Sequence, residues 1–266
     1  MVPAVLGLLA SFTTYDPFGS PIRFVGFANY LSVLRDPTFT AAARNIAVFT
    51  LVAVPLELGI GFALAYLLRG PMPGRELCRV LLLVPWLVSP IGGGVMWHFL
   101  FGSATGIPDY IAGWIGQTEV PSPLGDVRLA LPTTVAIEVW RMAPLVGFLL
   151  LPGLTAIPRE RWDLATLDGA PLIRRVTEVA LPPLGPLLLA ITMLLVGFAL
   201  GTFDAVLILT GGGPGTATET PALYSYQAAF GTNDWHRSGA AAWLVAAGVL
   251  AIGFIYLRLS QASRRA

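Results

Sequence analysis

Lysine is absent from this chain, and cysteine, histidine and charged residues of either sign are scarce. The single cysteine is Cys78, and the two histidines are His98 and His236. A disulfide framework or a histidine- and cysteine-based metal site therefore lacks the residues it needs, and we expect no metal and no cofactor. The 16 basic residues, all arginine, nearly balance the 15 acids, so the net charge of +1 predicts no nucleic-acid partner.

Apolar residues dominate what is present: 55% of the 266 residues are hydrophobic and only 12% are charged, the composition of a membrane protein. A helix needs about 20 mostly apolar residues to cross the hydrocarbon core. The sequence thus predicts an all-α, polytopic protein with a single transmembrane domain over 1–266. Five stretches meet the requirement: 44–68, 80–101, 129–152, 183–209 and 239–257. The apolar opening, 1–12, is too short to cross alone, so we expect a partial first span that is naturally short or begins upstream of Met1.

Arginine counts in the connecting segments predict the orientation, because basic flanks resist translocation. Segments 69–79, 153–182 and 258–266 together hold ten arginines, whereas 13–44, 102–128 and 210–238 hold five in a longer total length. We expect the first set, including 153–182 and the C-terminus, to be cytoplasmic. The glycine-rich stretch 209–220 is then expected on the outer side.

The segment 153–182 is unusually charged for a connection between apolar stretches. Pro158 suits the first turn of one short helix, Asp168-Gly169 interrupts it, and Pro171 opens a second helix with an apolar face. Pro182-Pro183 is expected to stop that second helix before the next span. Two interpretations remain open on this pattern: a knob presented to a cytosolic partner, or an interfacial helix lying along the lipid headgroups.

The spacing within this segment resembles the cytoplasmic EAA loop of permease subunits in binding-protein-dependent ABC importers. In that family the loop is the coupling helix, which docks on a separate ATP-hydrolysing subunit, and the glycine permits a sharp turn. Asp163 stands where Glu is usual and Leu164 where Ala is usual. The residues to which the resemblance assigns coupling are Asp163, Leu164, Ala165, Asp168, Gly169, Val179, Leu181 and Pro182.

Other stretches resemble the carbohydrate-uptake branch of the same family, which includes maltose-type and glycerol-phosphate-type permeases. They are FVGFANY (24–30), RVLLLVPWLVSP (79–90), IEVWRMAPL (137–145) and LTGGGPGTATET (209–220). The resemblance implies a MetI-like permease core in the bacterial plasma membrane. It also implies a second permease subunit as heterodimer partner, an ATP-binding-cassette ATPase dimer, an extracytoplasmic solute-binding protein, and a sugar or glycerol phosphate as the solute.

The expected third span carries helix-breaking residues. Pro85, Pro90 and Gly92-Gly93-Gly94 should break or loosen it. A broken helix at membrane depth is tolerated where protein or a water-filled cavity covers the freed backbone groups, as a polar solute path requires. A simple kink that shapes helix packing explains the same residues equally well.

Charged residues inside the expected spans are few and expensive, on the order of 3 kcal/mol each on insertion scales. Glu138 and Arg141 lie three residues apart and are expected to neutralise each other on one helix face. Glu57 and Asp204 have no partner nearby in sequence. Residues that could line a sugar path, by combining polar groups with aromatic rings, are Glu57, Trp97, Trp140, Phe203 and Asp204.

The leading hypothesis is therefore a non-catalytic permease subunit of an ATP-driven carbohydrate importer. No Walker motif occurs, and the GGGP at 211–214 follows no strand and precedes no Lys-Ser/Thr, so ATP hydrolysis is expected on partner subunits. An ion-coupled secondary transporter is the alternative, but it predicts internal repeats and a chain of ionisable residues at the midplane. A membrane-embedded enzyme would need clustered catalytic residues, which two distant histidines do not supply.

Overall fold

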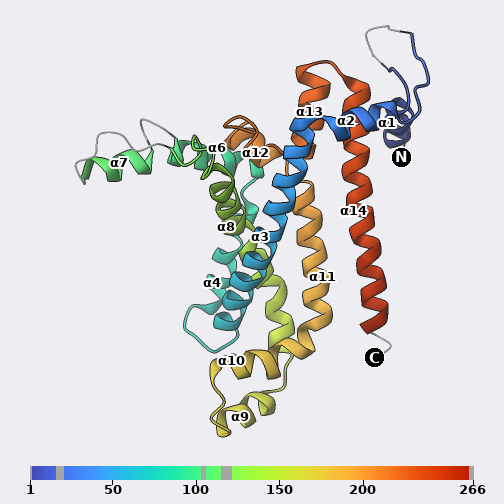
Figure 1. The fold of residues 1–266 in the computed structure, drawn as a ribbon. Coiled ribbons are helices and arrows are strands. Elements are labelled where there is room, and N and C mark those ends of the chain that lie inside the picture. Colours follow the sequence, from blue (N-terminus) through green and yellow to red (C-terminus); the bar gives the residue numbers. More distant parts are fainter. Residues whose placement is uncertain (1, 16–20, 103–105, 115–121, 264–266) are drawn as a thin grey trace. The chain divides into compact units, whose positions relative to one another are not determined.

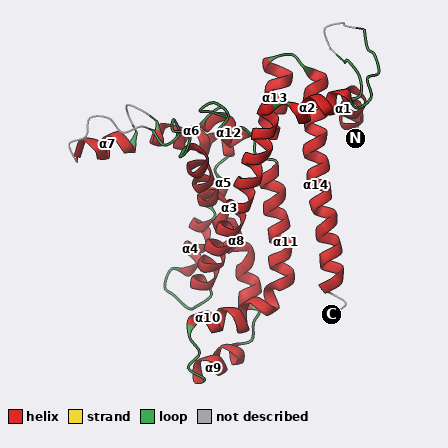
Figure 2. Ribbon diagram, viewed as in Figure 1, coloured by secondary structure: helices red, strands yellow, loops and turns green. Residues whose placement is uncertain are grey.

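The computed structural model describes residues 2–15, 21–102, 106–114 and 122–263. These residues are mostly helical, and they contain no β-strand beyond an isolated bridge between Thr13 and Phe24 (Figures 1 and 2). The helices are α1 (Val2–Ser11), α2 (Ala28–Arg35), α3 (Pro37–Leu68), α4 (Arg75–Leu82), α5 (Val84–Leu87), α6 (Pro90–Phe101), α7 (Ile107–Trp114), α8 (Ala130–Thr155), α9 (Arg159–Leu167), α10 (Leu172–Arg174), the π-helix η1 (Arg175–Ala180), α11 (Leu181–Leu200), α12 (Asp204–Leu209), α13 (Pro221–Tyr226), the π-helix η2 (Gln227–Gly231) and α14 (Trp235–Ser263).

Four helical stretches within the described residues are long and apolar enough to cross a membrane. They are Pro37–Leu68, Ala130–Thr155, Leu172–Leu200 and Trp235–Phe254. A fifth arises if α4–α5 and α6 are counted as one broken span. The break lies at Val88-Ser89, where the backbone becomes extended before Pro90, and it confirms that the prolines interrupt the third span.

The chain folds into two compact units. The first comprises Met1–Leu51, Pro90–Ala136 and Gly197–Ile255, and the second comprises Val52–Ser89, Ile137–Val196 and Tyr256–Ala266. Each therefore combines segments that are distant in sequence.

In the first unit, Asp36 joins the start of α3 to the helices α13 and α14. Its carboxylate accepts a hydrogen bond from the Thr38 amide (2.8 Å), which caps α3, and another from the Tyr224 hydroxyl (2.8 Å). Arg237 lies 3.6 Å from the same carboxylate. Burial alone would raise the pKa of Asp36, but these hydrogen bonds and the Arg237 charge outweigh it, and the pKa is lowered. The carboxylate is therefore held charged at neutral pH.

In the second unit, glycines allow α3 and α8 to approach closely. A Cβ added to Gly61 would lie 2.5 Å from Val146 and 2.8 Å from the Ala143 carbonyl oxygen, and Gly147 faces the Gly61 carbonyl. Gly153 meets Leu184 of α11 in the same way. Because hydrocarbon tails are as apolar as the side chains, close backbone packing of this kind is what holds membrane helices together.

Candidate functional site

The segment predicted to couple to an ATPase forms a sharp elbow between α9 and α10, and both helices are visible around it in Figure 1. The Gly169 N–H donates to the Thr166 carbonyl (3.0 Å) and the Ala170 N–H to the Ala165 carbonyl (3.0 Å). This pair of bonds is the Schellman motif that ends many helices, and it requires a left-handed residue at Gly169, whose φ is +64°. These backbone hydrogen bonds fix the elbow, and a Cβ added at Gly169 would meet no atom within 4 Å.

The elbow exposes large apolar side chains. Leu164 is 61% exposed and Leu167 84% on α9, while Leu172 and Ile173 on α10 are 62% and 74% exposed. Between the two arms lies a hollow of about 370 Å³ whose wall includes four of the predicted coupling residues: Leu164, Ala165, Asp168 and Val179. Asp163 lies on the other side of α9 and lines a different pocket. An exposed apolar knob with a charged rim is suited to docking on a partner surface.

The second arm of the elbow does not stop at Pro182-Pro183, so that prediction is wrong. The arm continues through η1 into α11 as one helical stretch, Leu172–Leu200. In η1 the Leu181 N–H reaches back five residues to the Val176 carbonyl. The α-helix therefore restarts at Leu181, and the two prolines fall in its first turn, where their missing N–H groups are tolerated.

The predicted pairing of Glu138 with Arg141 is confirmed. Arg141 donates through Nε to Glu138 Oε2 (3.1 Å) and through an Nη atom to Oε1 (2.6 Å), a bidentate pair in which the Glu138 side chain is 6% exposed. Glu57, which has no partner nearby in sequence, is 3% exposed on α3 and lies within electrostatic reach of both residues. Tertiary packing thus gathers two carboxylates and one guanidinium into one buried cluster of the second unit.

The other proposed path residues are divided between the two units. Trp97 on α6 and Phe203 and Asp204 at the start of α12 belong to the first unit, whereas Trp140 on α8 belongs to the second, as does Glu57. Within the first unit, α6 packs against α12: a Cβ on Gly94 would lie 3.1 Å from Ile208. His98 Nδ1 is 2.9 Å from the Leu209 carbonyl oxygen. Phe203 also begins a chain of ring contacts through Tyr226 (4.9 Å) and Phe230 (5.0 Å) to Trp235 (5.2 Å).

Sequence reasoning overlooked Glu219 in the loop before α13. Glu219 is 3% exposed, and its Oε1 has no hydrogen-bond partner among the described residues. The loop around it is held by Asn45 of α3, whose Nδ2 donates to the carbonyls of Thr216 (2.7 Å) and Glu219 (3.1 Å). Burial raises the pKa of Glu219 to about 7. Sequence alone gives no signal for this, because a Glu between two threonines in a glycine-rich loop is ordinarily solvated.

The Glu219 side chain should make the stability of the protein depend on pH. The unfolded carboxyl ionises near 4.5 and the folded one near 7, so stability falls as pH rises through that interval. Between about pH 6 and about pH 8 the loss is on the order of 1 kcal/mol. In thermal unfolding of the purified protein, we expect Glu219→Gln to flatten this dependence, while the exposed control Glu178→Gln should retain it. An unchanged slope in Glu219→Gln would show that another group titrates.

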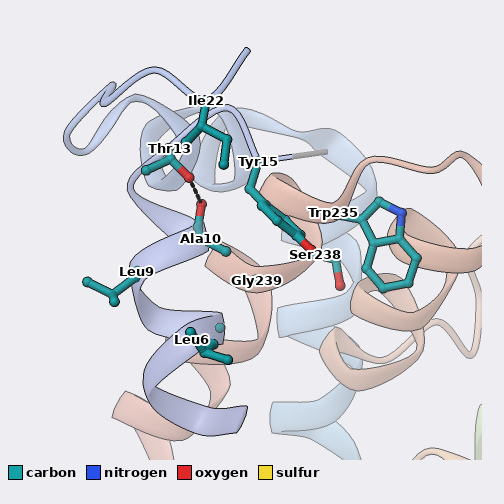
Figure 3. A pocket seen from close by; sticks show the side chains of 10 residues that line it. Leu6, Leu9, Ala10, Thr13, Tyr15, Ile22, Trp235, Ser238 and Gly239 are labelled. Atoms are coloured by element: carbon teal, nitrogen blue, oxygen red, sulfur yellow. Dashed lines mark hydrogen bonds between the residues drawn. The ribbon is translucent and has the colours of Figure 1, made fainter. Parts of the chain in front are cut away.

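An apolar pocket of about 460 Å³ lies between α1, the segment that follows it and the start of α14 (Figure 3). Leu6 and Leu9 line it from α1, and Trp235 and Gly239 line it from α14. The helices meet closely here, since a Cβ on Gly239 would lie 3.3 Å from the Gly7 carbonyl oxygen. With few polar atoms in its wall, the pocket is poorly suited to a sugar.

Known membrane transport proteins are similar to this chain in sequence. A family model described as "Binding-protein-dependent transport system inner membrane component" matches residues 49–266. The trehalose/maltose transport system permease protein MalF of Thermococcus litoralis is 32% identical over 241 residues, which cover 91% of this chain and 81% of that protein. The sn-glycerol-3-phosphate transport system permease protein UgpA of Brucella abortus is 30% identical over 262 residues, which cover 97% of this chain and 88% of that protein.

A solved structure shares the fold. A chain of the bacterial alginate ABC transporter, crystallised with its alginate pentasaccharide-bound periplasmic protein, superposes with a TM-score of 0.83. The match covers 98% of this chain and 88% of that chain at 18% sequence identity. The all-α, MetI-like fold expected from the sequence is confirmed.

Proposed function

The chain belongs to the family of binding-protein-dependent transport system inner membrane components, and from this membership we propose that it forms half of the solute path of an ATP-driven importer. It is a permease subunit of an ABC importer and not an enzyme. The proposed partners are a second permease subunit, an ATPase dimer and an extracytoplasmic solute-binding protein. The relatives named for trehalose, maltose and sn-glycerol-3-phosphate favour a polyhydroxylated solute, a sugar or a sugar-like molecule.

Coupling to the ATPase is assigned to the elbow around Gly169. The observation that carries this assignment is the combination of a rigid Schellman turn with exposed apolar side chains on both arms. Because the second arm continues without interruption into α11, a force applied to the elbow would pass directly into a span. Leu181 and Pro182 lie at that junction, and the wall of the hollow supplies Leu164, Ala165, Asp168 and Val179.

The solute path is proposed to use Trp97, Trp140, Phe203 and Asp204. Asp204 is exposed, and Phe203 opens the chain of aromatic rings in the first unit. Rings of this kind stack on the apolar faces of sugars, while carboxylates accept hydrogen bonds from hydroxyl groups. Glu57 is buried beside the Glu138–Arg141 pair, so it would reach a solute only in another conformation of the chain.

The proposed orientation places 69–79, 153–182 and the C-terminus in the cytoplasm, and Cys78 offers a direct test of it. Cys78 is exposed, is the only cysteine of the sequence and lies in the first of these segments. A membrane-impermeant maleimide should label it in inside-out vesicles and leave it unlabelled in right-side-out vesicles. Labelling in right-side-out vesicles only would place the elbow on the wrong side for an ATPase.

Crosslinking tests the docking of the elbow. In a Cys78→Ser background, Asp163→Cys in the assembled transporter should form a crosslink to the ATPase subunit through a short bifunctional reagent. Asp126→Cys, placed in the segment expected on the outer side, serves as the matched control and should not. Capture of lipid alone from position 163 would favour an interfacial helix and would count against coupling.

A further inference from the structure

A second pocket, of about 870 Å³, lies in the second unit next to the elbow, and Asp163 is the one predicted coupling residue in its wall. We call it the arginine pocket, because its wall contains Arg69, Arg75, Arg79 and Arg159 together with the rings of Tyr66 and Trp162. The end of α3 with the residue that follows it, both turns of α4 and the first turns of α9 contribute these side chains. Four of the 16 basic residues of the chain thus surround one hollow.

Positive charge in this pocket exceeds negative charge. Glu76, outside the wall, pairs with Arg79 (2.9 Å) and Arg75 (3.5 Å), and Asp163 lines the wall. Two carboxylates therefore face four guanidinium groups. Since like charges repel, an anion that neutralises the excess would stabilise the cluster.

Ring stacking orients Arg69 in this pocket, and burial leaves a donor atom of Arg79 without a partner among the described residues. The Arg69 guanidinium lies 3.5 Å from the centroid of the Trp162 ring and 4.2 Å from that of Tyr66. This stacking fixes its plane while leaving its N–H groups at the ring edges. Arg79 Nε is buried and has no hydrogen-bond partner within the described part of the chain. The pocket thus combines an oriented guanidinium fork with an unsatisfied donor.

We propose that the arginine pocket binds a phosphoryl group, and that its source is the headgroup of an anionic lipid in the inner leaflet. Planar guanidinium groups match phosphate oxygens in bidentate geometry. Arg69 directly follows α3, and the short helix α4 carries Arg75 in its first turn and Arg79 in its last, so in the proposed orientation they sit at headgroup depth. Leu67, which is 69% exposed, extends the wall toward the apolar surface where an acyl chain would lie. Free phosphate has no apolar group that could contact this margin.

Occupancy would connect the spans to the coupling elbow. Arg159, Trp162 and Asp163 belong to α9, whereas Arg69 directly follows α3 and Arg79 belongs to α4. One phosphoryl group contacting both sets would hold α9 against the spans. This consequence rests on the proposed function, and the choice of an inner-leaflet lipid rests on the proposed orientation, whereas binding of a phosphoryl group rests on neither.

The test measures lipid retention by the assembled transporter. The complex is purified from nanodiscs of phosphatidylcholine containing phosphatidylglycerol, and retained lipid is counted by native mass spectrometry. Each arginine near an anionic surface contributes roughly fivefold to affinity, so Arg69→Gln with Arg79→Gln should weaken phosphatidylglycerol retention about 25-fold. Arg69→Lys keeps the charge but loses the fork and should give an intermediate value. Arg128→Gln, at an exposed arginine in the segment 102–128 expected on the outer side, should match the wild type.

Separate measurements distinguish the possible occupants of the arginine pocket. Saturable binding of radiolabelled inorganic phosphate, lost in the double variant and accompanied by no retained lipid, would keep the phosphoryl site and assign it to a soluble source. Equal lipid retention and equal phosphate binding in the wild type and the double variant would overturn the proposal. So would loss of the ATPase subunit from the double variant with lipid unchanged, because the pocket would then receive an acidic protein surface. Labelling of Cys78 reports the orientation independently of all these results.

Discussion

Isoleucine at position 169 is expected to abolish most transport-coupled ATP hydrolysis while the protein still inserts and assembles. Gly169 has a φ of +64°, and a β-branched residue in that left-handed conformation costs about 1–2 kcal/mol. This penalty would raise the equilibrium constant for opening the two Schellman hydrogen bonds about five- to thirtyfold. Solute-stimulated ATPase activity in proteoliposomes is the measurement. It should fall by at most about five- to thirtyfold, the change in the opening equilibrium, if the ATPase must dock on the closed turn.

Two further variants distinguish the loss of the turn at Gly169 from a general loss of stability. Gly169→Asn should retain most activity, because asparagine tolerates the left-handed region. Gly74→Ile meets the same kind of backbone penalty at a φ of +74° in the 69–75 turn, outside the elbow, and should leave stimulation near the wild-type level. Full activity in Gly169→Ile would refute coupling through this elbow, and equal losses in both isoleucine variants would attribute the effect to stability.

The second large effect is expected at the buried ion pair. Glu138→Ala removes the bidentate partner of Arg141, whose side chain is only 18% exposed, and leaves Glu57 as the remaining neighbouring acid. Removing one member of a buried pair costs about 3–5 kcal/mol, because the other charge stays desolvated without its partner. Thermal unfolding in detergent should therefore shift strongly downward. The double variant Glu138→Leu, Arg141→Met should recover most of the loss, since apolar replacements of both partners leave no buried charge.

An exposed pair supplies the matched control. Arg174 and Glu178 form an ion pair four residues apart, with side chains 58% and 59% exposed. Glu178→Ala should change the stability by less than about 1 kcal/mol. If Glu138→Ala proves equally mild, Glu57 or water must neutralise Arg141, and the structural role of the Glu138–Arg141 pair would be disproved.

The elbow shows which structural features local sequence can predict. Gly169 and Pro171 mark the turn because each restricts or permits particular backbone angles whatever the rest of the chain does. The same reasoning failed at Pro182-Pro183, because whether a proline stops a helix depends on the register of the hydrogen bonds before it. The π-helix at Arg175–Ala180 shifts that register, and nothing in the residue types predicts the shift.

What the sequence determined by itself was the membrane setting, the helical fold and the pairing of Glu138 with Arg141, all of which follow from composition and spacing along one chain segment. Tertiary structure alone decided which distant groups meet. It brought Glu57 to that pair, buried Glu219 in a loop held by Asn45, and gathered four arginines from α3, α4 and α9 around one pocket. The physical reason is that periodicity assigns a residue to a face of its own helix, whereas the neighbour of that face is chosen by packing between segments far apart in sequence.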